Sequence, residues 1–273
     1  MYATLEIVRE GAIATVWMNR PEVHNAFDER LIDELTRACR ELDGDASVRV
    51  VVLGGRGKNF SAGADLNWMR RAAENGIDEN RRDALRLAEM LRVLAHMSKP
   101  TIARVQGAAL GGGTGLTAAC DMAVAAMDAV FSTSEVRFGI IPSAISPYVL
   151  RAIGPRQALR YFQSAERISA ERALAIGLVH EVAATDQLDG VLAALAAELL
   201  AGGPSALQAA KGLVRDITGR PIDAAIGDET AERIARQRAT DEAREGIAAF
   251  LEKRRASWRP SLTGRPPRRP RHR

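Results

Sequence analysis

Two glycine-rich segments are the parts of this sequence best suited to chemistry. Residues 107–116 read Gly-Ala-Ala-Leu-Gly-Gly-Gly-Thr-Gly-Leu, and residues 55–65 read Gly-Arg-Gly-Lys-Asn-Phe-Ser-Ala-Gly-Ala-Asp. Glycine lets a ligand or another segment approach the backbone closely. A helix that begins near Gly112 would have unpartnered N–H groups in its first turn, and its dipole would favour negative charge there. The pattern therefore predicts a site for a phosphate or for an oxygen that becomes negatively charged.

Two backbone N–H groups, one from each segment, would together bind a single oxygen. Both segments follow an apolar run that predicts a buried strand, so both lie at strand ends. A thioester needs such a pair when its α-carbon gains or loses a proton, because the enolate charge collects on the thioester oxygen. A tight turn between strand and helix is the other interpretation of these glycines. The glycines alone leave both interpretations open.

Nucleotide binding is a weaker interpretation of the same glycines. Gly113, Gly115 and Ala118 match the spacing of a loose dinucleotide fingerprint. The helix that they would open has only a few residues before Asp121 begins a strand, and the segment does not lie at the start of a βαβ unit. No Walker A sequence is present, because Gly57-Lys58 lacks the glycine five residues upstream.

Cysteine and histidine are too scarce and too scattered for a metal or nucleophilic site. The two cysteines, Cys39 and Cys120, exclude a disulfide framework and a clustered cysteine zinc site, and they make a reducing cytoplasm the default compartment. No histidine has a Ser or Cys in a nucleophile elbow nearby. We expect no metal ion and no redox cofactor. The histidines are His24, His96, His180 and His272.

The elements that must position the two segments follow an α/β pattern. Apolar runs predict strands at residues 4–9, 12–18, 48–53, 101–106 and 121–126. Helical periodicity lies between them, and Asp28 has the position of a helix N-cap. From about Ile145 onward the pattern is almost wholly helical, with residues 178–182 as the one strand-like exception. Strands that alternate with helices predict an α/β core.

The clearest break in the pattern lies near residue 200, at Ala201-Gly-Gly-Pro204. We expect a core of residues 1–200 that carries the site, followed by a helical region of residues 201–258. Residues 259–273 form a Pro/Arg-rich end that cannot pack a core, and we expect a solvated, disordered tail there. The helices predicted in the last third of the chain cover residues 187–200, 205–218 and 222–255.

The charge distribution argues against a nucleic-acid-binding domain. The chain has 273 residues, with 38 Lys and Arg, 34 Asp and Glu and a net charge of +4. Eight arginines and no acidic residue lie within residues 254–273, so the rest carries −4. Polyanion binding by this end is the less favoured interpretation. The first ten residues do not have the pattern of a signal or transit peptide, and no run of 18 apolar residues predicts a membrane span.

Several short motifs, spread over nearly the whole chain, carry a resemblance to a known family. They are Asn19-Arg20-Pro21, Phe60–Asp65, Lys99–Ala103, Gln106–Gly113, Cys120-Asp121, Phe131 with Glu135, Gly139–Pro142, Ile168–Ala173, Gly177–Val179 and Glu245–Phe250. At these residues the chain resembles the crotonase (enoyl-CoA hydratase/isomerase) superfamily. The resemblance implies a spiral core of repeated ββα units and a C-terminal helical trimerisation region. It also implies a homotrimer or a dimer of trimers that acts on an acyl-CoA thioester.

The resemblance further implies roles for individual residues. The two amides of the oxyanion hole belong to Ala64 and Gly112. Coenzyme A, which is part of the substrate and not a cofactor, lies along the loops near Arg20–Val23 and Ala62–Leu66. The substrate-binding and CoA-binding residues are Arg20, Val23, Ala62, Asp65, Leu66, Met69, Gly115, Pro142, Ser143, Phe250 and Lys253.

Some of these residues have a second interpretation. Phe250 and Lys253 match C-terminal contacts with the nucleotide end of coenzyme A, which a neighbouring subunit can supply. Packing within a helix is the alternative for Phe250, and a solvated helix face is the alternative for Lys253. Trp68 and Met69 would line the acyl pocket or belong to the core, and Met69 has the better correspondence to the family.

One carboxylate has the position of a catalytic base. Glu135 lies in a mostly uncharged stretch, residues 131–139, shortly before Pro142. From the residues alone it is either a partly buried base or an ion-pair partner of Arg137. By resemblance, Glu135 falls on the catalytic glutamate of the hydratases and isomerases and would act as general acid and base.

The sequence departs from the family pattern at Gly115, where typical enoyl-CoA hydratases have a second glutamate. Gly112 and Gly115 are three residues apart and share a helix face, so a glutamate there would reach the bound thioester. We expect the glycine to leave room for a wider acyl group or a water molecule. Hydration delivers a hydroxyl group to C3 and a proton to C2, and two carboxylates can share these two steps. A shift of the double bond from Δ3 to Δ2 needs only one base, which carries a proton between two carbons. The carboxylate count therefore favours an isomerase.

The stretch from Ser134 to Tyr148 favours a hydratase instead. It resembles members that hydrate branched enoyl-CoAs of the methylglutaconyl-CoA and geranyl-CoA types, which often have a small residue at the position of Gly115. Typical hydratases have a glycine where this chain has Ser143, whose amide would still bind the attacking water. We expect an enoyl-CoA hydratase, with a Δ3,Δ2-enoyl-CoA isomerase and a non-catalytic CoA-binding protein as the two alternatives.

Overall fold

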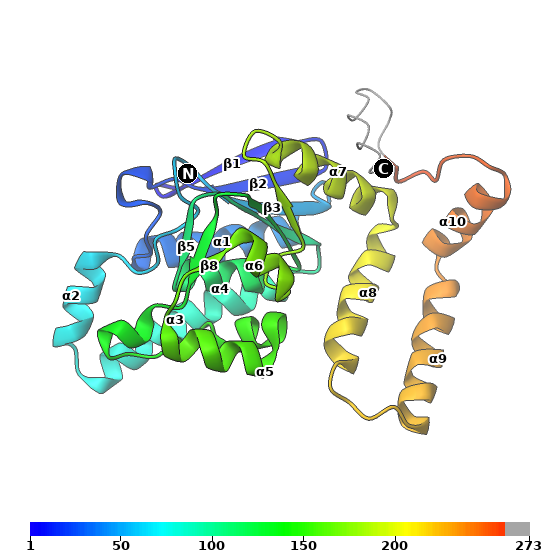
Figure 1. The fold of residues 1–273 in the computed structure, drawn as a ribbon. Coiled ribbons are helices and arrows are strands. Elements are labelled where there is room, and N and C mark those ends of the chain that lie inside the picture. The colour runs from blue at the N-terminus through cyan, green and yellow to red at the C-terminus, as the bar shows by residue number, and fades with distance from the viewer. Residues whose placement is uncertain (260–273) are drawn as a thin grey trace. The chain divides into compact units, whose positions relative to one another are not determined.

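The computed structural model describes residues 1–259, and the chain divides into two compact units. The first unit consists of residues 1–97 and 101–192, and the second consists of residues 98–100 with the residues from 193 onward. Figure 1 shows the order of the elements along the chain. The predicted Pro/Arg-rich tail lies, from residue 260 on, outside the described residues.

A six-stranded sheet forms the framework of the first unit. Its strands, in spatial order, are β1 (Leu5–Glu10), β2 (Ile13–Met18), β3 (Val50–Gly55), β4 (Thr101–Val105), β6 (Met122–Ala126) and β9 (Glu181–Ala183). β1 and β2 form an antiparallel hairpin, and all other neighbours are parallel. Every residue of β3 is buried, as expected for a central strand of a parallel sheet. Because parallel strands end at the same edge, the segments after β3 and β4 come together there.

A second sheet contains three short strands, β5 (Ala108–Leu110), β7 (Val130–Ser132) and β8 (Ile168–Ser169). β4 in the large sheet leads into β5 in the small one and then into helix α4 (Gly112–Ala119), and β6 leads likewise into β7. The segment after β3 joins the same layer through a bridge between Ser61 and Ala109. Each repeat therefore places one strand in the large sheet and the next segment in the small sheet. This is the repeated arrangement that the resemblance implies.

The long predicted strands are confirmed as β1, β2, β3, β4 and β6. The strand-like run at residues 178–182 forms a strand only from Glu181 to Ala183, as β9. The sequence does not predict β5, β7 or β8, because two or three residues are too few for an alternating pattern to show.

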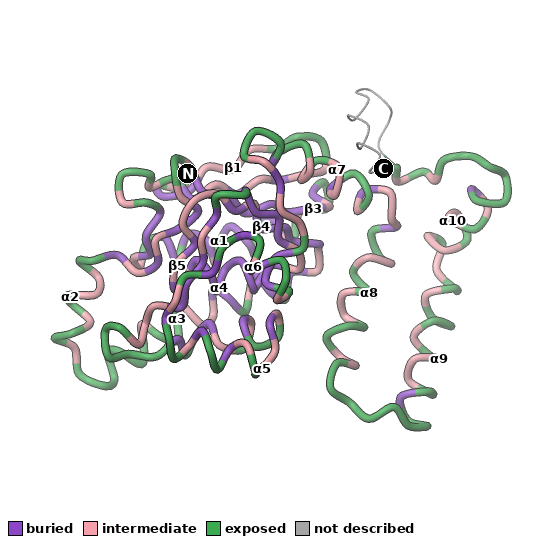
Figure 2. Tube along the Cα trace, in the orientation of Figure 1, coloured by how far each residue is buried: buried purple, intermediate pink, exposed green. Residues whose placement is uncertain are grey.

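In the first unit some helices pack on the strands and others pack on those helices. Besides α4 they are α1 (Glu29–Gly44), α2 (Leu66–Glu74), α3 (Ile77–Ala95), α5 (Ser146–Ser164) and α6 (Ala170–Ala175), with the short 3-10 helices η1 (Pro21–Val23) and η2 (Glu135–Phe138). Asp28 caps α1 as predicted, since its carboxylate accepts the Leu31 N–H. Figure 2 shows the buried segments concentrated in the strands and in α4. The largest fully buried side chains include Phe27, Phe60 and Phe131.

The second unit is helical. α7 (Leu188–Ala201) begins in the first unit, and α8 (Pro204–Ile217), α9 (Ala224–Arg238) and α10 (Asp241–Leu251) follow in the second. The prediction of one helix at residues 222–255 is wrong, because the Thr240 hydroxyl accepts the Ala243 N–H and starts α10 as a separate helix. Among the described residues no single helix is long and apolar enough to cross a membrane. Within residues 1–259, α7 and α8 have that length and apolar character when taken together, but they are bent by 103° at their junction.

Large apolar side chains remain exposed on the second unit. Where exposed apolar side chains gather into one patch, a partner typically covers that patch. The exposed side chains are Leu213, Val214, Ile222, Ile234, Ile247, Phe250 and Leu251. Figure 2 shows how much of α8, α9 and α10 is exposed or half-buried.

Candidate active site

Ala64 lies in the segment that follows β3, and its amide has no hydrogen-bond partner in the part of the chain that the structure describes. Phe27 brackets it from one side. The Phe27 N–H donates to the Gly63 carbonyl at 2.7 Å, and the Asp65 N–H donates to the Phe27 carbonyl at 2.8 Å, which is a parallel bridge between Phe27 and Ala64. Because N–H groups alternate in direction along an extended segment, the Ala64 N–H points away from Phe27.

Gly112 is the first residue of α4, and its amide is likewise unused within residues 1–259. The preceding Gly111 has a φ of +51°, and its N–H donates to the Ser132 carbonyl of β7 at 2.7 Å. Gly111 thereby ends β5 and turns the chain into the helix. Gly112 and Ala64 are both partly exposed.

The two glycine-rich segments lie against each other. The Leu110 N–H donates to the Ser61 carbonyl at 2.9 Å, and the Ser61 N–H donates to the Ala108 carbonyl at 3.0 Å. Gly63 has a φ of +92°, and a Cβ there would lie 3.0 Å from the Leu110 carbonyl oxygen, so glycine suits this crossing. The structure therefore brings together the two segments that the sequence predicts to converge.

The Glu135 carboxylate lies beside the start of α4. Its Oε1 is 3.3 Å from the point that a Cβ on Gly111 would occupy, and its Oε2 is buried with no hydrogen-bond partner among the described groups. Burial raises the pKa of Glu135 above its ordinary value, and a bond from its own backbone opposes this only in part. No charge from Arg137 contributes to that pKa, so the ion-pair interpretation is not supported. A desolvated carboxylate with one oxygen left without a partner, near the start of a helix, is typical of a general base.

The space beside Gly115 is filled. A Cβ there would overlap Cγ2 of Ile145 and lie 2.7 Å from its Cβ. Ile145 is 2% exposed and immediately precedes α5. The expectation that Gly115 leaves room for an acyl group or a water molecule is therefore wrong, because an isoleucine side chain from another element takes that room. The same contact excludes a carboxylate at position 115 unless Ile145 moves.

Arg20 is fixed by three acceptors of its own chain. Its guanidinium donates to the Ala26 carbonyl at 2.5 Å and pairs with Asp28 and Asp65, each at 3.1 Å. Asp28 and Asp65 are the N-caps of α1 and α2. Burial by itself raises the pKa of Asp65, but the backbone N–H groups that it caps and the Arg20 charge lower it overall. Arg20 thus joins the starts of two helices, and its contact with coenzyme A stays a prediction.

Other predicted contacts with coenzyme A or the acyl group surround this network. Val23 ends η1, Met69 lies on α2, and both are half-buried. The Ala62 N–H donates to the His24 carbonyl at 2.9 Å, and Leu66 is 70% exposed. The structure places these four residues in the segments around Ala64, and their contact with a ligand stays a prediction.

The Ser143 amide is already occupied, contrary to the expectation that it binds the attacking water. Its N–H donates to the Ile141 carbonyl at 2.8 Å, and its carbonyl accepts the Ser146 N–H at 3.1 Å and the Ser146 hydroxyl at 2.8 Å. Pro142 is buried, whereas Ser143 is exposed. This turn therefore serves to start α5 and offers no water site through that amide.

Phe250 and Lys253 belong to the second unit. Phe250 lies near the end of α10 and is 81% exposed, so it does not pack within the described chain. Lys253 follows α10 with a φ of 54°, and its N–H donates to the Phe250 carbonyl at 3.2 Å. The alternative of helix packing for Phe250 is therefore not supported. Both residues remain predicted contacts with coenzyme A.

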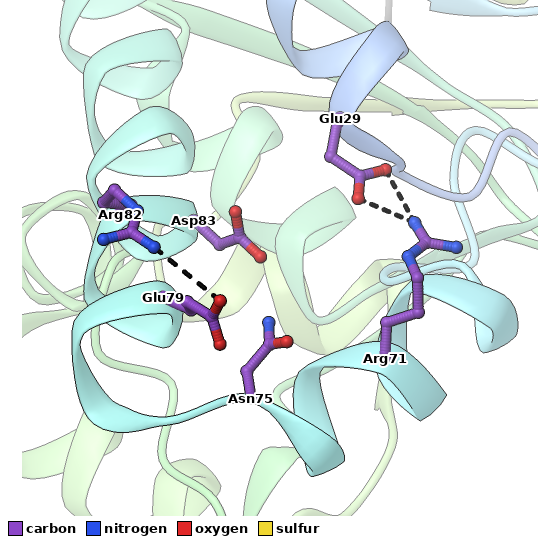
Figure 3. Close-up of a pocket in the computed structure, with 6 residues that line it drawn as sticks. All are labelled: Glu29, Arg71, Asn75, Glu79, Arg82 and Asp83. Atoms are coloured by element: carbon purple, nitrogen blue, oxygen red, sulfur yellow. Dashed lines mark hydrogen bonds and ion pairs between the residues drawn. The ribbon is translucent and has the colours of Figure 1, made fainter.

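A polar hollow of about 250 Å³ lies among α1, α2 and α3 (Figure 3). Arg71 donates to both oxygens of Glu29, at 2.6 and 2.9 Å, and ties α2 to the start of α1. No group of three or more metal-ligating side chains is present in residues 1–259. None of the predicted site residues lines the hollow. Its lining residues are Glu29, Arg71, Asn75, Glu79, Arg82 and Asp83.

Two residues that shape this region are not predicted by the sequence. Phe27 brackets Ala64, and Ile145 fills the space beside Gly115. Both are ordinary apolar residues, and their roles depend on contacts with a distant segment that no local pattern reveals. The sequence offers one clue to Phe27: it lies between the motif Asn19-Arg20-Pro21 and the helix cap Asp28.

Comparison with known proteins identifies the family. The family model for enoyl-CoA hydratase/isomerase matches residues 8–261. A crotonyl-CoA hydratase of Syntrophomonas wolfei is 32% identical over 94% of this chain and 98% of its own length. A 2,3-dehydroadipyl-CoA hydratase of Escherichia coli is 33% identical over 92% and 96%, respectively. The crystal structure of an enoyl-CoA hydratase from Shewanella pealeana is 41% identical, with a TM-score of 0.91 over 94% of this chain and 96% of that one. With its two layers of strands and its converging glycine segments, the chain belongs to the enoyl-CoA hydratase/isomerase family of the crotonase superfamily.

Proposed function

We propose that the protein is an enoyl-CoA hydratase, which adds water across the 2,3 double bond of an enoyl-CoA thioester. The observation that carries the proposal is the half-buried Glu135 carboxylate: its Oε2 is buried with no hydrogen-bond partner among the described groups, and its Oε1 lies beside the start of α4. The unused amides of Gly112 and Ala64 supply two donors for the thioester oxygen. The relatives named as hydratases support the same activity.

Glu135 acts first as a base and then as an acid. The ionised carboxylate takes a proton from a water molecule, whose oxygen forms a bond to C3 of the substrate. The π electrons move onto C2 and the thioester oxygen, where the Ala64 and Gly112 N–H groups stabilise the enolate. The protonated Glu135 then gives its proton to C2, and the product is a 3-hydroxyacyl-CoA. The raised pKa of Glu135 suits this double role. A general acid and base works best when its pKa is close to the pH of the reaction, and burial shifts the pKa of Glu135 upward in that direction.

A Δ3,Δ2-enoyl-CoA isomerase is the second candidate, and the contact between Ile145 and Gly115 favours it. This contact leaves no space for a second carboxylate at position 115. In an isomerase, Glu135 would take a proton from C2 of a 3-enoyl thioester and return it to C4. The same enolate and the same two amides would serve both reactions.

The assembly, compartment and cofactor requirement are further parts of the proposal. A homotrimer or a dimer of trimers is supported by the exposed apolar side chains of α8 to α10 and by the resemblance to the family. The low number of cysteines supports a cytoplasmic location. Coenzyme A enters as part of the substrate, and the proton transfers at Glu135 need no other cofactor. A branched acyl group is supported by the stretch from Ser134 to Tyr148.

Three thioesters separate the candidate functions. The measurement follows the ultraviolet absorbance of the conjugated enoyl thioester with crotonyl-CoA, with a branched ester of the methylglutaconyl type and with a 3-enoyl-CoA. Loss of absorbance with either of the first two means hydration, and the faster ester gives the acyl preference. A gain of absorbance from the 3-enoyl-CoA, without loss from the others, means isomerisation. No change with any of them would contradict both candidates and leave a non-catalytic CoA-binding protein.

The variant Glu135→Gln tests the assignment of the base. We expect turnover to fall by about 10²- to 10⁴-fold, because the amide cannot move a proton, while the dissociation constant of the thioester changes little. Glu171→Gln is the matched control, since Glu171 is an exposed glutamate on α6, and it should keep wild-type turnover. A Glu135→Gln enzyme with wild-type turnover would show that another group is the base.

A further inference from the structure

Phe27 contacts both segments that carry the oxyanion amides. Its backbone N–H and carbonyl hold the Gly63–Asp65 segment through bonds of 2.7 and 2.8 Å. Its ring lies on the other segment, because a Cβ added at Gly112 would overlap Cε2 of Phe27 and lie 2.7 Å from Cδ2. One residue, 1% exposed, therefore spans the space between the two donors.

We propose that Phe27 is a positioning residue that sets the separation of the Ala64 and Gly112 amides. The inference rests on the proposed function, because it assigns a cause to the geometry of that oxyanion hole. The backbone of Phe27 fixes one donor, and the edge of its ring fixes the other. Phe27 acts on the reaction only through the positions of the two amides.

The surroundings of Phe27 make it a rigid spacer. The preceding residue, Ala26, gives its carbonyl to the Arg20 guanidinium, and the following residue, Asp28, caps α1 and pairs with the same guanidinium. Both polar groups of the Phe27 backbone are used in the bridge to the Ala64 segment. The backbone is thus fastened on both sides, and the ring transmits that position to the start of α4.

The size of the Phe27 ring matters because Gly112 has no side chain that could fill the space left by a smaller residue at position 27. A shorter residue at position 27 would leave a void against the Gly112 α-carbon, and the first turn of α4 would be free to shift toward it. An oxyanion hole needs donors 2.7–3.1 Å from the developing charge. A displacement of about 1 Å costs on the order of 10²-fold in rate.

The test uses the variant Phe27→Leu and a thioester that reports on its own carbonyl. In 4-(dimethylamino)cinnamoyl-CoA, hydrogen bonds to the carbonyl oxygen draw electrons from the amino group and shift the absorbance to longer wavelength. We expect wild type to shift the bound probe and Phe27→Leu to lose at least half of that shift. Turnover should fall by at least about tenfold, with the dissociation constant of the probe within about threefold of wild type.

Leu42→Ala is the matched control, because Leu42 is equally buried near the far end of α1 and the change removes a similar number of atoms. It should lower the unfolding temperature and leave the absorbance shift and turnover unchanged. If Phe27→Leu does not fold, Phe27→Met, which stays apolar but lacks the ring edge that lies on Gly112, should fold and show the same loss of shift.

The outcomes separate the inference from the proposed function. A full absorbance shift and full turnover in a folded Phe27→Leu or Phe27→Met protein would overturn the role of Phe27 alone. A wild-type protein that binds the probe with no shift would overturn the oxyanion hole, and the inference with it. Loss of the shift in the Phe27 variants but not in Leu42→Ala supports the positioning role, since general loss of core packing affects all of these variants.

Discussion

Glu135 is a carboxylate whose surroundings favour its neutral form, although the proposed reaction begins from its ionised form. Burial raises its pKa above the ordinary value of 4.5. We therefore expect log kcat/KM to fall with a slope of one as the pH drops through a value above 4.5. A pH–rate profile with crotonyl-CoA measures this limb. An acid limb at or below the ordinary value of glutamate would contradict the burial of the base.

The same pKa has the opposite consequence for stability. Because the folded protein binds this proton more tightly than the unfolded chain, its stability falls as the pH rises from 4.5 through the raised pKa of Glu135. Glutamine stays neutral, so Glu135→Gln should unfold at a temperature equal to or higher than wild type at neutral pH. Thermal unfolding of both proteins across that pH range checks the sign. A clearly less stable variant would mean that the carboxylate has a stabilising partner.

Ile145 and Gly115 form a pair in which each residue depends on the size of the other. We expect Gly115→Glu to destabilise the fold by about 1–3 kcal/mol, because its side chain would collide with Ile145. The double variant Gly115→Glu with Ile145→Ala should recover part of that loss, since the shorter residue opens the space. Denaturant unfolding of the two variants, with Ile145→Ala alone as the control, measures the coupling. Additive effects would show that the two side chains do not compete.

At the scale of elements, Glu34 joins the residues before β1 to helix α1. Its carboxylate accepts the N–H groups of Ala3 and Thr4 and the Thr4 hydroxyl, at 2.7–3.0 Å. Burial alone raises the pKa of Glu34, but these hydrogen bonds outweigh it and lower the pKa to about 2. The stabilisation is therefore complete above about pH 4.5 and is lost as the pH falls toward 2.

Removal of this carboxylate tests the link between the N-terminal residues and α1. We expect Glu34→Ala to cost about 1–3 kcal/mol at neutral pH, because the two buried donors of Thr4 lose their acceptor. The difference from wild type should shrink in acid, as the wild-type carboxylate becomes protonated. Denaturant unfolding at several pH values measures it. A difference that does not change with pH would mean that lost packing, and not charge, sets the cost.

The elements differ in how far the sequence predicts them. β3 is a run of apolar residues that ends in two glycines, and β4 is a mostly apolar run that follows Pro100, so both have the pattern of a buried strand. The break between α9 and α10 depends on a single threonine cap inside an otherwise continuous helical pattern, so periodicity alone misses it. In the candidate site, glycine loops and a family motif predict Ala64, Gly112 and Glu135.

The contacts of Phe27 and Ile145 could not be predicted in the same way. Each lies against a glycine that is far away in sequence, and a missing side chain leaves no pattern that names its neighbour. The Ser143 amide is a similar case. Its N–H donates to the Ile141 carbonyl within a local turn and is therefore not available to a water molecule. Sequence therefore predicts the converging glycine segments better than the side chains that pack against them.

At the scale of the whole molecule, the exposed apolar side chains of the second unit require an explanation. Val214 on α8 is 68% exposed within the single chain. If α8 contributes to a trimer interface, Val214→Asp should shift the protein toward monomers, because an unpaired charge is costly to bury. Sedimentation velocity measures the assembly, and Gln208→Asp, at an exposed polar position of the same helix, should keep the wild-type size. A wild-type monomer would contradict the proposed assembly.

The contact between Ile145 and Gly115 has a stereochemical consequence for the product. A single carboxylate that serves both C2 and C3 reaches the double bond from one side. In the proposed hydration the hydroxyl group and the new hydrogen therefore add to the same face, and we expect the reaction in heavy water to yield one diastereomer of a 2-deuterio-3-hydroxyacyl-CoA. A second acid at position 115 would have allowed the two additions to be divided between two groups, so one apolar contact restricts the geometry of the whole addition.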